Sequence, residues 1–360
     1  MIRPDESLIR DADLREVVER QRASGVGGPL LDSLIRVQIA AQEKRDTAAA
    51  REAKAEEQRR QLTPIGRRKQ FVREVISNEQ LSPDALRYTH SVLALCGLPY
   101  RRLPEGVTEY ERTNGKMAVT VQAGKLRTPD GAKVQQPVPY GPKARLLMAH
   151  LSSEAVRNNS PTVEIADSLS AFMREMGIEP RGGARGTIQP FKDQINALAA
   201  CRIEMSAWDG HRARQMEEKP FKSVEVWFPT NPDQRMLWPN TVTFSDAFFQ
   251  DLTKHAMPVN VHVLRHLANS ARKLDLYFWL NYRLNSISSC LTVPWSALLN
   301  QFGDGFTRER AFRAQLVDEL NDIKELFPRL PLTMSETGIT LEPAGPDVLG
   351  IPGKLSLKKR

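Results

Sequence analysis

Side chains suited to reading DNA bases gather near the C-terminal end of the chain, in the segment TRERAFRAQL. Its four candidate residues are Thr307, Arg308, Arg310 and Arg313. Arginine is well shaped for bidentate hydrogen bonds to O6 and N7 of guanine, and each such pair is worth about 1–3 kcal/mol of discrimination. We expect Arg310 and Arg313 to read bases, and Thr307 and Arg308 to contact phosphates.

A helical period orients these arginines. The apolar positions Phe312, Leu316, Leu320 and Ile323 fall on one helical face. This places Arg310 on the opposite face and Arg313 on the flank. A purely structural alternative stays open: an exposed helix whose Arg310 pairs with Glu309 or Asp318.

The surrounding segment, residues 294–341, has the order of a winged helix. It contains a short apolar helix (PWSALLNQF), the turn GDG, the basic helix and the hairpin-like tail LPLTMSETGITL. A recognition helix meets DNA with its N-terminal end. The second helix is basic at its start and acidic at its end, as that geometry requires.

A related but less basic constellation lies earlier, in GTIQPFKDQINALAA. Ile188, Phe191, Ile195 and Leu198 form its apolar face. Gln189 and Asn196 point away from that face, flanked by Lys192. Thr187 opens the helix, as its N-cap if Pro190 lies in the first turn, and is a further DNA-contact candidate. Gln and Asn pair bidentately with adenine. Asp193 on the same exposed side weakens this interpretation, so a protein-facing or merely solvated surface remains an alternative.

Four more arginines flank that helix: Arg181, Arg185, Arg212 and Arg214. The first two lie in the turn RGGARG before the helix, and the others in the charged excursion DGHRARQMEEKP. We expect all four to contact phosphates. A helix over 142–156, a short helix ending at Gly177 and the strands CRIEMSAW and SVEVWF complete a second helix–turn–helix with a long wing.

The rest of the chain is divided by its turn signals. Residues 25–29 separate a first charged helix from a polar helix over 30–61. Helices are expected over 65–76, 83–95, 246–255, 261–268 and 272–284, and a hairpin at Asn114-Gly115. Residues 228–240 read as an interdomain joint. The expected fold is mainly α with small β wings (α+β), in two tandem winged-helix domains.

The expected domains are a charged, partly disordered helical arm (1–63), winged-helix domains over 64–230 and 231–345, and a basic tail (346–360). The arm is either a solvated helix or a docking element for another protein. We expect removal of residues 1–62 to spare DNA affinity.

Composition favours a polyanionic partner in a reducing compartment. The net charge is +8, and the three cysteines, Cys96, Cys201 and Cys290, are far apart, each expected as a small buried side chain. No apolar run reaches the length of a membrane helix, and no signal peptide opens the chain. A cytoplasmic protein is expected.

The sequence contains no recognisable pattern of catalytic residues. RGGARG lacks the spacing of a phosphate-binding loop, and His262 and His266 lack a third metal ligand. No catalytic set of Ser–His–Asp or Cys–His type is present. We therefore expect no enzyme, no metal and no cofactor.

Two stretches resemble the RepA-type plasmid replication initiators. The first begins YGPKARLLMAHLSSEAVRNN and continues through GTIQPFKDQINALAACRIEMS; the second is LDLYFWLNYRL with the following VPWSALLNQFG. The resemblance extends over about residues 64–345 and is most specific in 140–206 and 274–303. The arm before residue 62 has no counterpart in it.

This resemblance implies a protein of bacterial plasmids that binds double-stranded DNA at repeated origin sites (iterons) through two winged-helix units. Bound copies would open an AT-rich segment and recruit the host initiator protein and the replicative helicase. The first unit would also mediate a homodimer. A winged-helix transcriptional regulator that represses its own gene is the alternative, and a protein-binding adaptor is a third.

Overall fold

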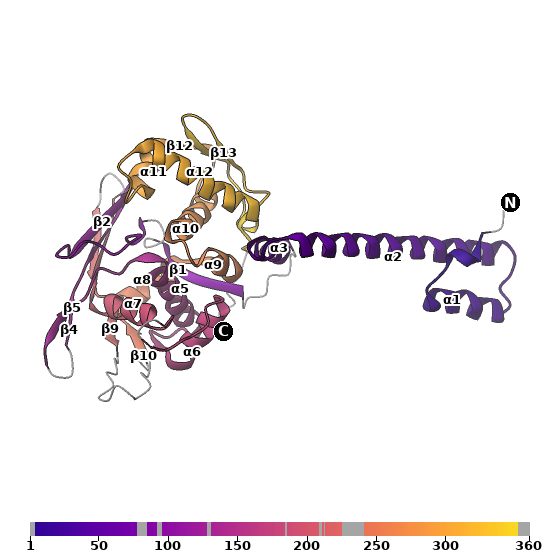
Figure 1. Cartoon of the computed structure of the whole chain (residues 1–360), viewed down its shortest axis with the longest axis horizontal. Coiled ribbons are helices and arrows are strands. Elements are labelled where there is room, and N and C mark those ends of the chain that lie inside the picture. Colours follow the sequence, from indigo (N-terminus) through magenta and orange to yellow (C-terminus); the bar gives the residue numbers. More distant parts are fainter. Residues whose placement is uncertain are drawn as a thin grey trace. The chain divides into compact units, whose positions relative to one another are not determined.

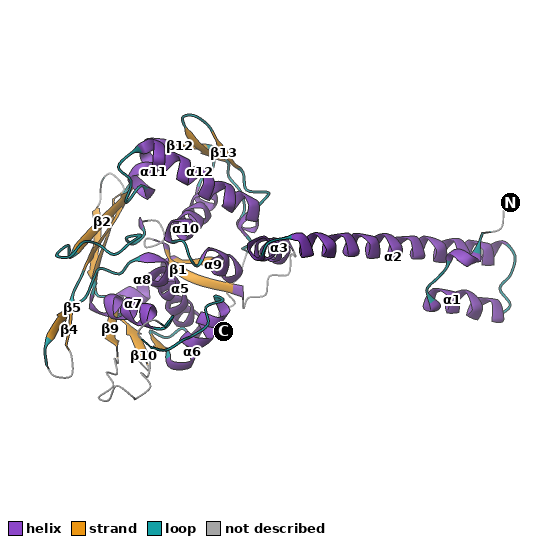
Figure 2. Ribbon diagram, viewed as in Figure 1, coloured by secondary structure: helices purple, strands orange, loops and turns teal. Residues whose placement is uncertain are grey.

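The computed structural model describes residues 4–77, 85–91, 96–127, 131–183, 186–208, 211, 213–224 and 241–351. The chain divides into unit 1, Met1–Arg68, and unit 2, Lys69–Arg360. Figure 2 shows a mixed α/β protein in which helices predominate and the sheets are small. All sheets among these residues are antiparallel.

Unit 1 is a helical hairpin. A 3-10 turn, η1 (Glu6–Leu8), precedes α1 (Ala12–Ala23) and α2 (Pro29–Gln61), and the expected break between the two helices is confirmed. The small core between them consists of Ile9, Leu14, Val18 and Ile35. Beyond this core α2 continues as a polar helix, as its thinning apolar pattern predicts.

The first half of unit 2 contains a helix–strand–helix–helix–strand–strand arrangement that we call the first repeat, residues 141–244. It comprises α5 (Gly141–Asn158), β6 (Thr162–Glu164), α6 (Ala166–Glu175), α7 (Gln189–Ala200), β9 (Phe221–Val224) and β10 (Thr241–Phe244). The strands form a sheet of order β6-β10-β9. Gly177 follows α6 with φ +72°, which confirms the predicted left-handed helix end.

The second half repeats this order over residues 271–341, the second repeat. It comprises α10 (Ala271–Ser286), β12 (Leu291–Pro294), α11 (Trp295–Phe302), α12 (Glu309–Leu326), β13 (Leu332–Met334) and β14 (Gly338–Leu341). Its sheet order is β12-β14-β13. In both repeats the last strand lies between the first and the second.

One side-chain contact recurs in the two sheets. The hydroxyls of Thr162 and Thr243 lie 3.2 Å apart across β6 and β10, and those of Thr292 and Thr340 lie 3.0 Å apart across β12 and β14. Hydrogen-bonded threonine pairs of this kind stabilise neighbouring strands. The two repeats thus share strand order, pairing direction and a cross-strand threonine pair.

A four-stranded sheet has the order β2-β3-β7-β8. Its first two strands precede the first repeat in the chain, and its last two lie between α7 and β9. β2 (Glu109–Asn114) and β3 (Met117–Gln122) form the hairpin predicted at Asn114-Gly115, and β7 (Arg202–Trp208) follows α7. The excursion expected as a wing loop contains a strand, β8 (Ala213–Glu218), paired with β7. β4 (Lys125–Arg127) and β5 (Lys133–Gln135) form a separate hairpin.

The remaining elements lie before, between and after the two repeats in the chain. They are α3 (Pro64–Ser77), β1 (Leu86–His90), α8 (Asp246–His255), β11 (Ala256–Asn260), α9 (Val261–Leu267) and a 3-10 turn, η3 (Pro346–Leu349). The helix expected over 83–95 is wrong at residues 86–90, because these residues form β1 and pair with β11, while residues 83, 84 and 92–95 lie outside the described part of the chain. Local periodicity favoured a helix, and a partner about 170 residues away overrode it.

One continuous apolar core joins both repeats. It includes the four residues predicted for the inner face of α12 and Phe191, Ile195 and Leu198 of α7, while Ile188 is half-buried at its edge. Cys96 and Cys201 are buried as expected, but Cys290 is exposed, because it lies in the loop between α10 and β12. Phe228 to Asn240, the expected joint, lies entirely outside the described residues.

Candidate nucleic-acid interface

The N-terminal end of α12 presents an exposed basic group. Thr307, Arg308 and Arg310 are exposed, and Arg308 occupies the N-cap position without a side-chain capping bond. Among the residues that the structure describes, no carboxylate forms an ion pair with Arg310. The alternative pairing with Glu309 or Asp318 is therefore not observed, and the side chain is available for an external ligand.

Arg313 is held differently. Its guanidinium lies 5.0 Å from the centroid of the Trp295 ring, and its Nη2 donates to the carbonyl oxygen of Ser335 at 3.3 Å. Trp295 Nε1 donates to the same carbonyl at 3.1 Å. Arg313 therefore links α12 to α11 and to the turn between β13 and β14, so that the arginine also positions the hairpin.

The C-terminal half of α12 carries the acidic side chains. Asp322 accepts from Lys69 of α3 at 2.9 Å and also pairs with Lys273 of α10, and these hydrogen bonds lower its pKa despite partial burial. Glu319 is buried beside Arg272, and burial raises its pKa. These contacts fix the end of the helix that is opposite to Arg308 and Arg310.

The first repeat places its candidates around the start of α7. Ile188, not Thr187, is the N-cap residue. Thr187 instead donates its hydroxyl to the carbonyl oxygen of Glu179 and accepts from the Arg181 backbone N–H at 2.9 Å. The expected cap is thus wrong, because the hydroxyl closes the preceding turn.

The remaining residues of α7 are partly engaged. Gln189 donates to Asp193 at 2.8 Å, so the amide that was expected to face adenine is bound within its own helix. Lys192 and Asn196 are half-buried, and burial lowers the pKa of Lys192. Arg181 is exposed. Arg185 and Arg212 lie outside the described residues, and only the backbone of Arg214, on β8, is described.

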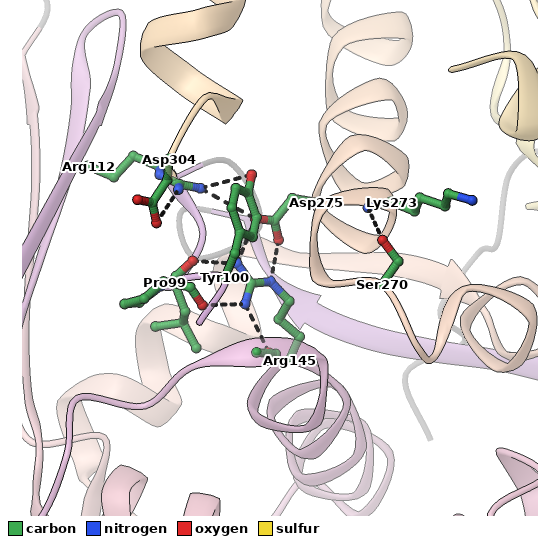
Figure 3. Close-up of polar contacts among 10 residues, drawn as sticks. Pro99, Tyr100, Arg112, Arg145, Ser270, Lys273, Asp275 and Asp304 are labelled. Atoms are coloured by element: carbon green, nitrogen blue, oxygen red, sulfur yellow. Dashed lines mark hydrogen bonds and ion pairs between the residues drawn. The ribbon is translucent and has the colours of Figure 1, made fainter. Parts of the chain in front are cut away.

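Sequence reasoning missed a buried polar cluster formed by residues of α5, α10 and β2 (Figure 3). Arg145 of α5 and Asp275 of α10 form a bidentate ion pair, with Nε to Oδ1 at 2.6 Å and Nη2 to Oδ2 at 2.7 Å. Arg112 of β2 approaches the same carboxylate at 3.5 Å and donates to the Tyr100 hydroxyl at 3.2 Å. Burial raises the pKa of Tyr100.

This cluster reaches the turn that leads into α12. Arg112 Nη2 lies 3.8 Å from an Asp304 carboxylate oxygen, and Asp304 belongs to the turn between α11 and α12. The ring of Tyr100 packs against the guanidinium groups of Arg112, Arg145 and Arg272. No sequence pattern predicted the cluster, because its residues come from elements that are far apart in the chain.

Metal binding finds no support in the described part of the chain, where no group of three or more His, Cys, Asp or Glu side chains could hold an ion. His262 packs edge-on against Phe71 at 6.0 Å between ring centroids. Within the same residues, no helix is sufficiently long and apolar to cross a membrane.

Residues 138–294 match the family model RepA_C, described as plasmid encoded RepA protein. This stretch is therefore similar to the C-terminal region of plasmid-encoded RepA proteins. The expected resemblance to RepA-type plasmid replication initiators is thereby confirmed.

The match begins just before α5 and ends with β12. It therefore contains the whole first repeat and only the opening of the second, and α11 and α12 lie beyond it. The match covers less than half of the chain. No curated protein is similar enough to count as a match.

Among solved structures, domains 2 and 3 of RctB are similar to the chain with 13% sequence identity and a TM-score of 0.44. The similarity covers 70% of this chain and 96% of that structure. A similarity at this level carries no argument about the site.

Proposed function

We propose that this protein is a plasmid replication initiator that binds iterons at its origin through two winged-helix domains, the first and second repeats. The observation that carries the proposal is the recurrence of one strand order, first–third–second, behind a helix–turn–helix in each repeat. The RepA_C match supplies the link to plasmid replication.

In this proposal α12 is the main reading helix. Arg310 reads a base, and Thr307 and Arg308 contact phosphates with the helix N-terminus toward the groove. Arg313 reads a flanking base or holds the β13–β14 wing against the DNA. α7 takes a secondary role, because Gln189 and Lys192 are less free to reach a groove.

Linking two DNA-binding domains in one chain raises affinity, since the second docking event becomes intramolecular. Origin opening draws on binding free energy through DNA bending and assembly of several copies. The protein acts as a cytoplasmic DNA-binding protein, with the host initiator and helicase as partners and a homodimer formed through the first repeat. No catalytic residue is assigned.

The decisive experiment is a footprint on the DNA that flanks the gene. We expect protection of several direct repeats, and plasmid loss when the gene is deleted. A footprint without sequence preference contradicts iteron binding. Protection of one inverted operator together with normal plasmid maintenance favours the alternative, a winged-helix regulator of its own gene.

A further inference from the structure

The β4–β5 hairpin carries a one-sided basic face. Lys125 and Arg127 are two residues apart on β4, and Lys133 pairs directly opposite Arg127. Side chains alternate along a strand, so these three cations and Gln135 share one face, while Leu126 and Val134 share the other. All three cations are exposed.

This face has no counter-ion among the residues that the structure describes. Arg127 donates to the carbonyl oxygen of Gly131 at 3.2 Å, and no described carboxylate forms an ion pair with Arg127, Lys125 or Lys133. Like charges directly opposite one another destabilise a strand pair. An external anion bound to this face would remove that penalty.

The base of the hairpin is fixed to α7. A Cβ on Gly124 would lie 1.9 Å from the carbonyl oxygen of Ala200, at the end of α7, so only glycine allows this approach. On the other side of the hairpin, the Tyr140 backbone N–H donates to the buried Gln194 side chain of α7 at 2.8 Å. In Figure 1 the strands extend from this base away from the helices of unit 2.

We propose that the β4–β5 hairpin is an additional DNA-contacting arm of the first repeat, in which Lys125, Arg127 and Lys133 bind backbone phosphates of a duplex. The inference rests on the proposed function and adds a contact element that the helix–turn–helix pattern does not contain. A protein surface is the less suitable partner, because protein interfaces favour aromatic side chains and deplete lysine. The exposed basic face contains two lysines and no aromatic residue.

The anchoring to α7 explains what such an arm contributes. The α7 helix has a single basic residue, Lys192, which is half-buried, and its Gln189 amide is bound to Asp193. Three phosphate contacts from a rigidly attached hairpin would supply the missing electrostatic affinity without adding sequence choice. We therefore assign sequence-specific recognition of bases to the helices and contacts to the DNA phosphate backbone to the hairpin.

The test measures the salt dependence of DNA binding by the full chain. The probe is a fluorescein-labelled 40-base-pair duplex of mixed sequence, and affinity is read by anisotropy between 50 and 200 mM NaCl. The variant Lys125→Gln, Arg127→Gln, Lys133→Gln removes the three charges. The control Lys44→Gln, Arg51→Gln, Lys54→Gln removes three exposed charges from α2 and causes the same change in net charge.

Three lost phosphate contacts make the slope of log affinity against log salt shallower by about 2.7, so the affinity ratio between 50 and 200 mM shrinks about 40-fold. The control keeps the wild-type slope. A charge-conserving variant, Lys125→Arg, Arg127→Lys, Lys133→Arg, also keeps it, which separates lost charge from a misfolded hairpin.

Two results overturn the inference. If the hairpin variant and the control have the same slope while the wild type binds the duplex, the basic face serves another partner. If the charge-conserving variant loses slope as fully as the glutamine variant, the effect comes from hairpin structure and not from charge. Failure of the wild type to bind any duplex instead overturns the proposed function itself.

Discussion

Arg145 and Asp275 form a buried bidentate ion pair between the helices that open the two repeats, α5 and α10. Both side chains are at most 4% exposed. Arg145 also donates to the carbonyl oxygens of Pro99 and Gly141. The pair therefore fixes the first repeat against the second, and through Arg112 it reaches the turn before α12.

Asp275→Asn should destabilise the fold strongly. Removing one partner of a buried pair leaves the other charge uncompensated, at a cost of about 3–5 kcal/mol. Urea unfolding of the two proteins measures the difference. Lys222→Gln is the control, because its pair with Asp246 is exposed at both ends and such pairs contribute about 1 kcal/mol or less. If the free energy of unfolding falls equally in the two variants, the buried pair contributes no more to stability than the exposed pair.

Arg310 and Arg313 should behave differently when replaced. Arg310→Ala should cost about 1–3 kcal/mol of DNA affinity and relax one position of the iteron, with little change in stability. Arg313→Ala should also lower the free energy of unfolding, because it removes the contacts to Trp295 and Ser335. Competition binding against single-base iteron variants and urea unfolding measure the two effects.

A uniform loss of affinity across all sequences would make Arg310 a phosphate contact and not a base reader. If Arg310→Ala and Arg313→Ala together leave DNA binding unchanged, the second repeat does not read DNA. The protein-binding adaptor would then be the better explanation.

Stability should fall in mild acid because of His150. This imidazole is buried and stacked on Phe172 with 4.4 Å between ring centroids, and burial lowers its pKa to about 3. In the unfolded chain, His150 binds a proton near the ordinary pKa of 6.5. The contribution of the neutral His150 to the free energy of unfolding is therefore complete above pH 6.5 and is lost as the pH falls toward 3.

Over this interval His150 contributes a slope of about 1.4 kcal/mol per pH unit. Urea unfolding at pH 7 and pH 5 measures it, and His150→Phe removes it while keeping an aromatic ring against Phe172. If the variant retains the full difference between the two pH values, other groups cause the acid sensitivity.

Removal of residues 1–62 should leave DNA affinity near that of the full chain and impair replication. The deleted segment has its own small core and ion pairs, such as those of Arg45 with Asp11 and Asp13, so its loss leaves the core of unit 2 intact. Anisotropy on an iteron duplex and plasmid copy number measure the two outcomes. If the deletion abolishes DNA binding, residues 1–62 are part of the DNA-binding surface.

The sequence by itself determined most helices and, in the second repeat, the order of helix, turn, helix and hairpin, but not the strand β12 that precedes them. Apolar residues recur with a helical period at Phe312, Leu316, Leu320 and Ile323. This period predicts which face of α12 is buried. Asn114-Gly115 fixed the β2–β3 hairpin for a similar reason, because the turn chemistry and its two strands are contiguous. Such features depend only on residues close together in the chain.

Tertiary structure alone decided which distant segments meet. Residues 86–90 read as helical by pattern, yet they pair with β11 because that partner offers a complementary edge. Arg145 and Asp275 are 130 positions apart in the sequence, and only the folded structure brings them together and buries both. Periodicity reports whether a face is buried but not what covers it. The partners of β1, Arg145 and Arg313 therefore follow only from the packed fold.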